Sequence, residues 1–181
     1  MPAVVYAVDV SISMAKSHGD FLPHKLASSL SALAISAKRI LSRKGKIGLV
    51  LFAGYASPVV PLTTEYDVLA RALGMITKTY EGSAPGDAIV ESVKLLRRTY
   101  TSEKKIIIIS DGEFNTGTPI EHASLYARNM GIDVHYVTVG ALQQVKIKGI
   151  LRELTNRKLL EWNHANSKNS LISILMNVSK S

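Results

Sequence analysis

Asp9-Val10-Ser11-Ile12-Ser13-Met14 follows an unbroken apolar run from Ala3 to Val8. Such a run ending in a polar loop predicts a buried β-strand. The strand would deliver one carboxylate and two hydroxyls into the loop on alternate residues, which share a face. These hard oxygen donors are the ligands that Mg²⁺ prefers. The stretch therefore predicts a strand end that can hold a divalent cation.

Composition indicates one globular domain spanning residues 1–181, because a chain of 181 residues can bury a sizeable core. No apolar stretch reaches the roughly 20 residues of a transmembrane helix, so we expect no membrane insertion. The N-terminus begins with the predicted strand rather than with the charged and apolar regions of a signal peptide. There is no cysteine, which excludes disulfides and thiol catalysis. The location we expect is cytoplasmic.

The chain is basic, with a net charge of +8 from 22 Lys and Arg against 14 Asp and Glu. A charge of this sign can attract nucleic acid or an acidic protein. The basic residues are scattered, however, near a predicted helix end, before a predicted strand and in a late segment. No recognised nucleic-acid motif and no strand with interleaved aromatic residues accompanies them. We therefore interpret the charge as a solvated surface and do not expect nucleic acid as a partner.

Predicted strands and helices alternate along the chain. The apolar patterns predict strands at residues 3–9, 46–53, 57–62, 105–110, 132–139 and 159–162. They predict helices at residues 22–41, 66–76, 85–100, 119–129, 144–155 and 171–178. Unbroken apolar strands indicate a sheet covered on both faces, and two prolines suit residues 57–62 to an edge. We expect a three-layer, Rossmann-like α/β fold whose mostly parallel sheet has about six strands, one of them an antiparallel edge strand.

A second carboxylate follows the strand predicted at residues 105–110, which contains four consecutive isoleucines and ends at Asp111. In an open parallel sheet, the ligand site lies beyond the carboxyl ends of the strands, at the switch point of the chain. If the strands that end at Asp9 and Asp111 are neighbours, their loops face one crevice. The loop at residues 81–87 can reach the same crevice and offers Ser83.

Together these segments resemble the von Willebrand factor A (vWA) domain with its metal-ion-dependent adhesion site, in the stand-alone intracellular form of prokaryotes. Asp9-Val10-Ser11-Ile12-Ser13 matches the family's Asp-x-Ser-x-Ser motif, and Asp111-Gly112 matches its Asp-Gly motif. Ser83 stands where the family has a threonine before a helix. The resemblance covers nearly the whole chain. It implies a cation, Mg²⁺ or else Mn²⁺ or Ca²⁺, held by Asp9, Ser11, Ser13, Ser83 and Asp111.

The resemblance also implies a protein–protein interaction module rather than an enzyme. In the family, hydroxyl groups bind the cation directly, aspartates bind it directly or through water, and a partner's Asp or Glu carboxylate fills the open position. Stand-alone prokaryotic members imply a partner that is an AAA+ ATPase or a subunit of a regulatory or assembly complex. The segment Gly19-Asp20-Phe21-Leu22-Pro23 is similar to the intracellular vWA domain of the proteasomal ubiquitin receptor.

Three assignments at the site stay open from the sequence. Ser83 could cap the following helix instead of binding a cation. Thr77 and Thr79 are the alternative ligands if the loop folds differently. Glu81 could fill the open coordination position from within the chain.

The alternative function is a Mg²⁺-dependent phosphoryl transfer or phosphatase-like reaction that uses Asp9. The haloacid-dehalogenase type needs a second aspartate two residues after the first, and this chain has Ser11 there. The chain also lacks a Gly-x-x-x-x-Gly-Lys phosphate-binding loop. These departures favour the interaction module.

Overall fold

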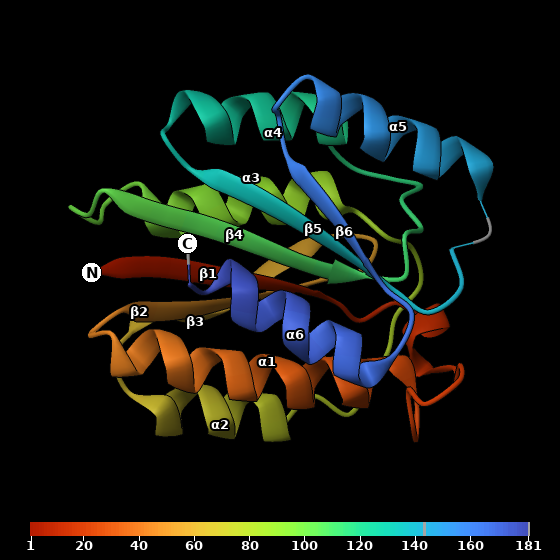
Figure 1. The fold of residues 1–181 in the computed structure, drawn as a ribbon, viewed down its shortest axis with the longest axis horizontal. Helices are drawn as coiled ribbons and strands as arrows, with labels where there is room; N and C mark the ends of the chain where they lie inside the picture. The colour runs from red at the N-terminus through yellow and green to blue at the C-terminus, as the bar shows by residue number, and fades with distance from the viewer. Residues whose placement is uncertain (143, 181) are drawn as a thin grey trace.

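A six-stranded sheet forms the middle layer of the computed structural model, which describes residues 1–142 and 144–180 (Figure 1). The strands lie in the order β3-β2-β1-β4-β5-β6. Their bounds are Pro2–Asp9 for β1, Lys46–Phe52 for β2, Ala56–Thr63 for β3, Glu103–Ser110 for β4, Asp133–Val139 for β5 and Glu161–Ala165 for β6. Neighbouring strands are parallel except β2 and β3, which are antiparallel. The predicted sheet, with its antiparallel edge strand, is confirmed.

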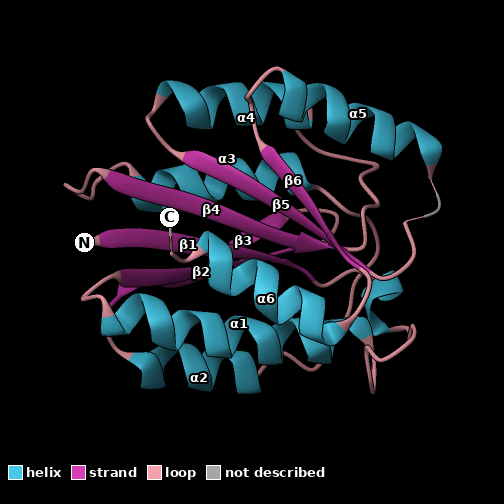
Figure 2. Ribbon diagram, viewed as in Figure 1, coloured by secondary structure: helices cyan, strands magenta, loops and turns pink. Residues whose placement is uncertain are grey.

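Six helices cover the two faces of the sheet in the described part of the chain (Figure 2). Their bounds are Lys25–Ser42 for α1, Tyr66–Gly74 for α2, Pro85–Leu96 for α3, Ile120–Asn129 for α4, Val145–Asn156 for α5 and Lys168–Val178 for α6. Helices α1, α2 and α6 lie on one face, and α3, α4 and α5 lie on the other. Alternate residues of β1 serve the two cores: Tyr6 packs toward α1 and α6, whereas Val5 packs toward α3.

Helix α1 begins three residues later than the apolar spacing predicts, at Lys25 rather than at residue 22. Pro23 disfavours helical geometry at the residue before it. His24 then caps the helix, because its Nδ1 accepts a hydrogen bond from the backbone N–H of Ala27 at 3.1 Å. The late start places a lysine in the first turn of α1, beside the end of the sheet.

Other boundaries also differ from the predicted ones, among them the starts of β6 and α6 and the end of α3. Strand β6 begins at Glu161 rather than at residue 159, because Leu159 and Leu160 fill the core before the strand begins. Helix α3 ends at Leu96, four residues before the predicted end. At β6, apolar residues that pack in the core precede the regular element, whereas the residues that follow α3 are largely exposed, with Tyr100 fully so.

The chain changes direction between β1 and β4, which are parallel neighbours with Val8 opposite Ile109. The strands that end near Asp9 and Asp111 are therefore neighbours, which is the condition on which the shared crevice depends. After β1 the chain forms a short 3₁₀ helix, Ile12–Ala15, where the sequence predicts a loop. The carboxyl ends of both strands meet at this switch point, where α/β folds place their ligands.

Gly86 allows α3 to lie against the loop that follows β4. A Cβ atom at Gly86 would lie 1.9 Å from the carbonyl oxygen of Thr118. We therefore expect Gly86→Ala to lower the free energy of unfolding by about 1–3 kcal/mol or more, the usual cost of overpacking. Gly149, on the exposed side of α5 with no atom near its Cβ position, is the matched control.

Gly149→Ala should raise the free energy of unfolding by about 0.5–1 kcal/mol, because alanine loses less backbone entropy in a helix. Chemical denaturation of the two variants measures both changes. Equal effects would mean that α3 and the loop after β4 do not meet as closely as described.

Candidate functional site

Asp9 lies at the centre of a cluster of oxygen atoms at the switch point. Its side chain is fully buried at the end of β1. Oδ1 accepts a hydrogen bond from the backbone N–H of Ser11 at 2.8 Å. Oδ2 accepts from the hydroxyl of Ser110 at 2.6 Å and from that of Ser83 at 3.2 Å. One carboxylate thus joins the ends of β1 and β4 to the loop before α3.

The hydroxyls of Ser11 and Ser13 lie next to each other on the loop after β1, with their Oγ atoms 3.0 Å apart. Asp111, directly after β4, completes the group. We call Asp9, Ser11, Ser13, Ser83, Ser110 and Asp111 the Asp9 cluster. Ser13 and Asp111 both line a cavity of about 410 Å³, which gives the cluster an open side. The five residues predicted from the sequence therefore gather at one end of the sheet.

A lysine occupies the open side of the cluster. Lys25 Nζ lies 2.8 Å from Asp111 Oδ2, and both side chains are largely buried. The other oxygen, Oδ1 of Asp111, is buried and accepts no hydrogen bond from any described residue. The ammonium group of Lys25 thus pairs with Oδ2 of Asp111, whereas Oδ1 has no hydrogen-bond donor among the described residues. A buried polar oxygen without a partner is rare in proteins.

Ser83 binds Asp9 rather than capping the next helix. Helix α3 begins at Pro85, and its cap residue Ala84 makes no side-chain cap. The backbone of Ser83 is held by the loop after β4: its N–H donates to Asn115 Oδ1, and its carbonyl accepts from the Asn115 N–H, both at 3.0 Å. The loop before α3 and the loop after β4 therefore hold Ser83 in place.

The alternative residues are not joined to the cluster. Thr77 instead lines a groove beside α2. Within residues 1–142 and 144–180, no hydrogen bond links the side chain of Thr79 or Glu81 to a cluster residue. Neither alternative gains support from this geometry.

Sequence reasoning missed three residues of the site: Ser110, Lys25 and Asn115. Ser110 precedes Asp111 at the end of a strand, and its position was the available signal. Lys25 could have been noticed because the first turn of α1 carries no acidic residue to offset it. Asn115 offered no local signal, since its role depends on a contact 32 residues away in sequence.

Burial raises the pKa of Asp9 from 3.8 to about 6. Removal from water disfavours the charged carboxylate, and the nearby negative charge of Asp111 adds to the effect. Hydrogen bonds from Ser11 and Ser110 oppose the rise without cancelling it. Asp9 takes part in no ion pair with a described residue. The cluster therefore holds a buried negative charge that lacks a cationic partner of its own.

The chemistry of the cluster suits a hard divalent cation. Two carboxylates and three neighbouring hydroxyls supply oxygen ligands, and the unpartnered Oδ1 of Asp111 is an acceptor without a donor. No group of three or more His, Cys, Asp or Glu that could hold a metal occurs in the part of the chain that the structure describes. A cation at the cluster would therefore depend on serine hydroxyls as well as on carboxylates, and Lys25 would have to release Asp111 or share it.

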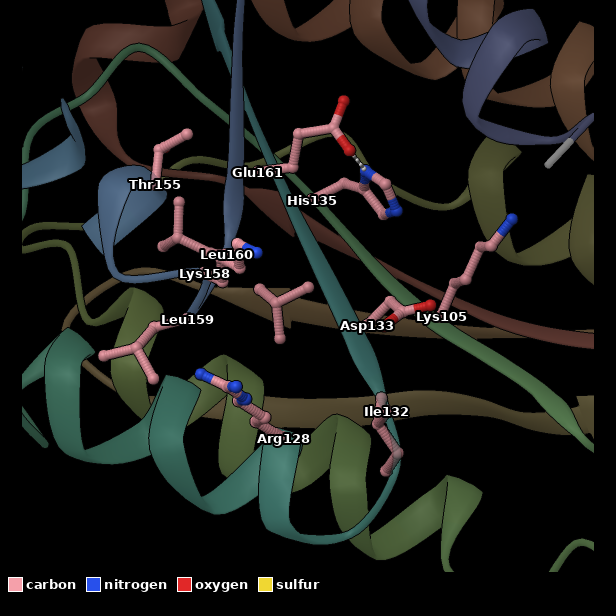
Figure 3. A pocket seen from close by; sticks show the side chains of 11 residues that line it. Lys105, Arg128, Ile132, Asp133, His135, Thr155, Lys158, Leu159, Leu160 and Glu161 are labelled. Atoms are coloured by element: carbon pink, nitrogen blue, oxygen red, sulfur yellow. Dashed lines mark ion pairs between the residues drawn. The ribbon is translucent and has the colours of Figure 1, made fainter. Parts of the chain in front are cut away.

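Another cavity, of about 460 Å³, lies at the opposite end of the sheet, where β4, β5 and β6 begin (Figure 3). His135 and Glu161 face each other there, with Nδ1 and Oε2 3.5 Å apart. The lining of this cavity includes both basic and acidic side chains, among them Lys105 and Glu161. No residue of the Asp9 cluster lines it. Size alone therefore does not identify the functional end of the sheet.

Known families and proteins resemble this chain in sequence and in fold. The sequence profile of the von Willebrand factor type A domain matches residues 4–113, which contain most of β1, all of β2 to β4 and the whole Asp9 cluster. A protein of Borreliella burgdorferi (strain ATCC 35210) described as uncharacterized is 27% identical over 109 residues. That stretch is 59% of this chain and 32% of the relative, so the chain matches about a third of the length of this curated relative.

Solved structures share the fold over nearly the full chain. The conserved hypothetical protein BatB from Bacteroides thetaiotaomicron superposes with a TM-score of 0.80 at 20% identity, covering 100% of both chains. An aerotolerance-related membrane protein from Bacteroides fragilis gives 0.77 at 19% identity, covering 99% of both. The vWA domain of SpRpn10 gives 0.73 at 13% identity, covering 97% of this chain and 94% of that one. At such identities the likeness shows the fold alone.

In the described part of the chain, no helix is both long and apolar enough to cross a membrane.

The raised pKa of Asp9 predicts a stability that depends on pH. Between pH 3.8 and about 6 the folded protein holds a proton on Asp9 that the unfolded chain releases. The stabilisation from this proton is therefore present below that window and is lost as the pH rises through it. In EDTA, Asp9→Asn should remove this loss and raise the free energy of unfolding at pH 7 by roughly 2–3 kcal/mol.

The measurement is urea denaturation across this pH range. Asp67→Asn, on the surface of α2, is the control and should change stability by less than about 0.5 kcal/mol. If the free energy of unfolding of the wild type equalled that of Asp9→Asn at every pH, the buried Asp9 carboxylate would not destabilise the folded state, and the expectation would be wrong.

Proposed function

The chain belongs to the von Willebrand factor type A family, whose domains generally act as protein-interaction modules, and from this premise we propose that it binds a partner's Asp or Glu carboxylate through a divalent cation. The cation, Mg²⁺ or else Mn²⁺ or Ca²⁺, would be held by Asp9, Ser11, Ser13, Ser83 and Asp111. The observation that carries the proposal is the convergence of two buried carboxylates and three hydroxyls on one open-sided cluster.

The ligand set leaves the cation attractive to one more carboxylate. Neutral hydroxyls in contact with a divalent cation do not offset its charge, and carboxylates that reach it through water offset that charge only in part. Mg²⁺ keeps several waters, one of which a partner's carboxylate can replace. The partner's carboxylate would approach from the cavity of about 410 Å³, because Ser13 and Asp111 line that cavity whereas Asp9 is fully buried.

Lys25 acts in this proposal as a tethered cation that competes for Asp111. It lies in the first turn of α1, where the helix dipole disfavours a positive charge. Its ion pair with Asp111, at 2.8 Å, compensates for that position. A divalent cation at Asp111 would remove this compensation and repel the ammonium group. Lys25 therefore lowers the affinity of the cluster for the cation.

The geometry speaks against an enzyme that uses Asp9 as a phosphoryl acceptor. Asp9 is fully buried, and both of its oxygens already accept hydrogen bonds. A substrate phosphate could reach it only after those bonds were broken. The buried carboxylate is better suited to orienting hydroxyls and balancing charge.

We place the partner in a cytoplasmic regulatory or assembly complex, with an AAA+ ATPase as the partner class. The support is the resemblance of Asp9–Met14 and Ser110–Gly117 to stand-alone prokaryotic members of the family.

Calorimetric titration with MgCl₂ and MnCl₂ tests the cation site. We expect one site per chain in the wild type and a loss of at least about tenfold in affinity in Asp111→Asn, which removes a charged ligand. Lys25→Met should bind about tenfold more tightly than wild type, because its competing ion pair is gone. Lys16→Met is the matched control, since Lys16 lines the same cavity but forms no ion pair with a described residue. No heat of binding with either metal would refute the site.

A pull-down from a lysate of the source organism tests the docking role. We expect partner proteins that are retained in Mg²⁺ to be lost in EDTA and to be lost equally with Asp111→Ala. Restoring Mg²⁺ should restore binding to the wild type only. Partners held equally in EDTA and by the variant would argue that docking does not use the cation.

A further inference from the structure

A groove of about 520 Å³ lies between α2 and strands β2 and β3, at the open edge of the sheet. Much of its wall is apolar, from Val59, Val60, Val68, Ala72, Met75 and Ile76. Two of these side chains are unusually exposed for their type, Met75 at 81% and Val59 at 44%. Exposed apolar side chains gathered in one concavity mark an interaction site.

The charged groups at the groove are all basic. Arg71 from α2 and Lys78 from the following segment are the charged residues in its described lining, which includes no Asp or Glu. The chain as a whole carries a net charge of +8. An occupant with an apolar face and acidic flanks would complement this groove, whereas a basic one would be repelled.

One end of the groove is built from the loop that carries the Asp9 cluster. Val10 and Tyr80 line the groove there. The Tyr80 N–H donates to the Val10 carbonyl at 2.9 Å, and the Ile12 N–H donates to the Tyr80 carbonyl at 3.0 Å. Val10 lies between Asp9 and Ser11 in the chain. The apolar groove and the oxygen cluster are therefore neighbouring parts of one surface.

The edge strand itself is a poor template for strand addition. Pro58 and Pro61 in β3 have no N–H to donate to an incoming strand. Proline on an edge strand blocks such pairing in many proteins. Recognition at this edge must therefore come from side chains that enter the groove, as when an amphipathic helix lays its apolar face into a hydrophobic groove.

We propose that this groove binds an amphipathic helix of a partner protein, with apolar residues on the buried face and Asp or Glu on the flank that meets Arg71 and Lys78. This inference extends the proposed function. It rests on that function in one respect only, namely that the groove and the Asp9 cluster bind the same partner. The helix would fill the groove, and its end would lie beside the loop that carries Ser11 and Ser13.

Methionine methyl NMR can test the groove with named probes. Met75 reports on the groove, Met14 on the loop of the Asp9 cluster, and Met130 on the opposite end of the sheet. The probe is an alanine-based helical peptide with leucines at i, i+3, i+4 and i+7 and glutamates on both flanks. We expect a saturable shift of Met75 with Met130 unmoved.

Two matched changes test the role of charge. The same peptide with lysines in place of glutamates should bind at least about fivefold more weakly. The double variant Arg71→Glu, Lys78→Glu, both exposed positions, should reverse that preference. Met75→Ser should weaken both peptides, with Met130→Ser as its control.

Three results would overturn the groove proposal: no shift of Met75, equal binding of both peptides, or a Met75 shift that depends on protein concentration without peptide. The last would identify a second copy of this chain as the occupant. Titration with MgCl₂, read at Met14, tests the cation site separately. A moving Met14 with a silent Met75 would leave the proposed function standing and the groove inference refuted.

Discussion

Burial of the Asp9 carboxylate is the constraint on which the end of the sheet depends. A carboxylate without water must be satisfied by protein donors. Here the donors come from three segments: the backbone of Ser11, the hydroxyl of Ser83 and the hydroxyl of Ser110. Satisfying Asp9 therefore brings together the loop after β1, the loop before α3 and the end of β4. The hydroxyls of Ser83 and Ser110 both donate to the same oxygen of Asp9, Oδ2.

Two groups of opposite charge, Asp111 and Lys25, form an ion pair at the open side of the cluster that contains Asp9. Asp111 lies at the mouth of the cluster, and Lys25 neutralises one of its oxygens while the other has no described partner. The same surface continues into the groove beside α2, where Arg71 and Lys78 are the charged residues among those described. The switch end of the sheet thus combines an acidic cluster, in which one oxygen of Asp111 lacks a described partner, with a neighbouring groove that is apolar and basic. The cavity at the opposite end, around His135, has no such organisation.

The sheet could be predicted from the sequence because unbroken apolar strands, such as the four isoleucines of β4, indicate burial on both faces. Asp9 and Asp111 could be placed at one edge because each follows such a strand. The start of α1 could not, because it depends on a cap by His24 rather than on apolar spacing. The ion pair of Lys25 with Asp111 joins residues 86 positions apart, and no local pattern reveals it.

The most direct test of the central claim is a crystal structure grown with MnCl₂, read from its anomalous difference map. We expect a single strong peak among the hydroxyls of Ser11, Ser13 and Ser83 and the carboxylate of Asp111, with Lys25 Nζ moved away from Asp111 Oδ2. A map without a peak at the Asp9 cluster, in which Lys25 keeps its 2.8 Å contact with Asp111, would contradict it.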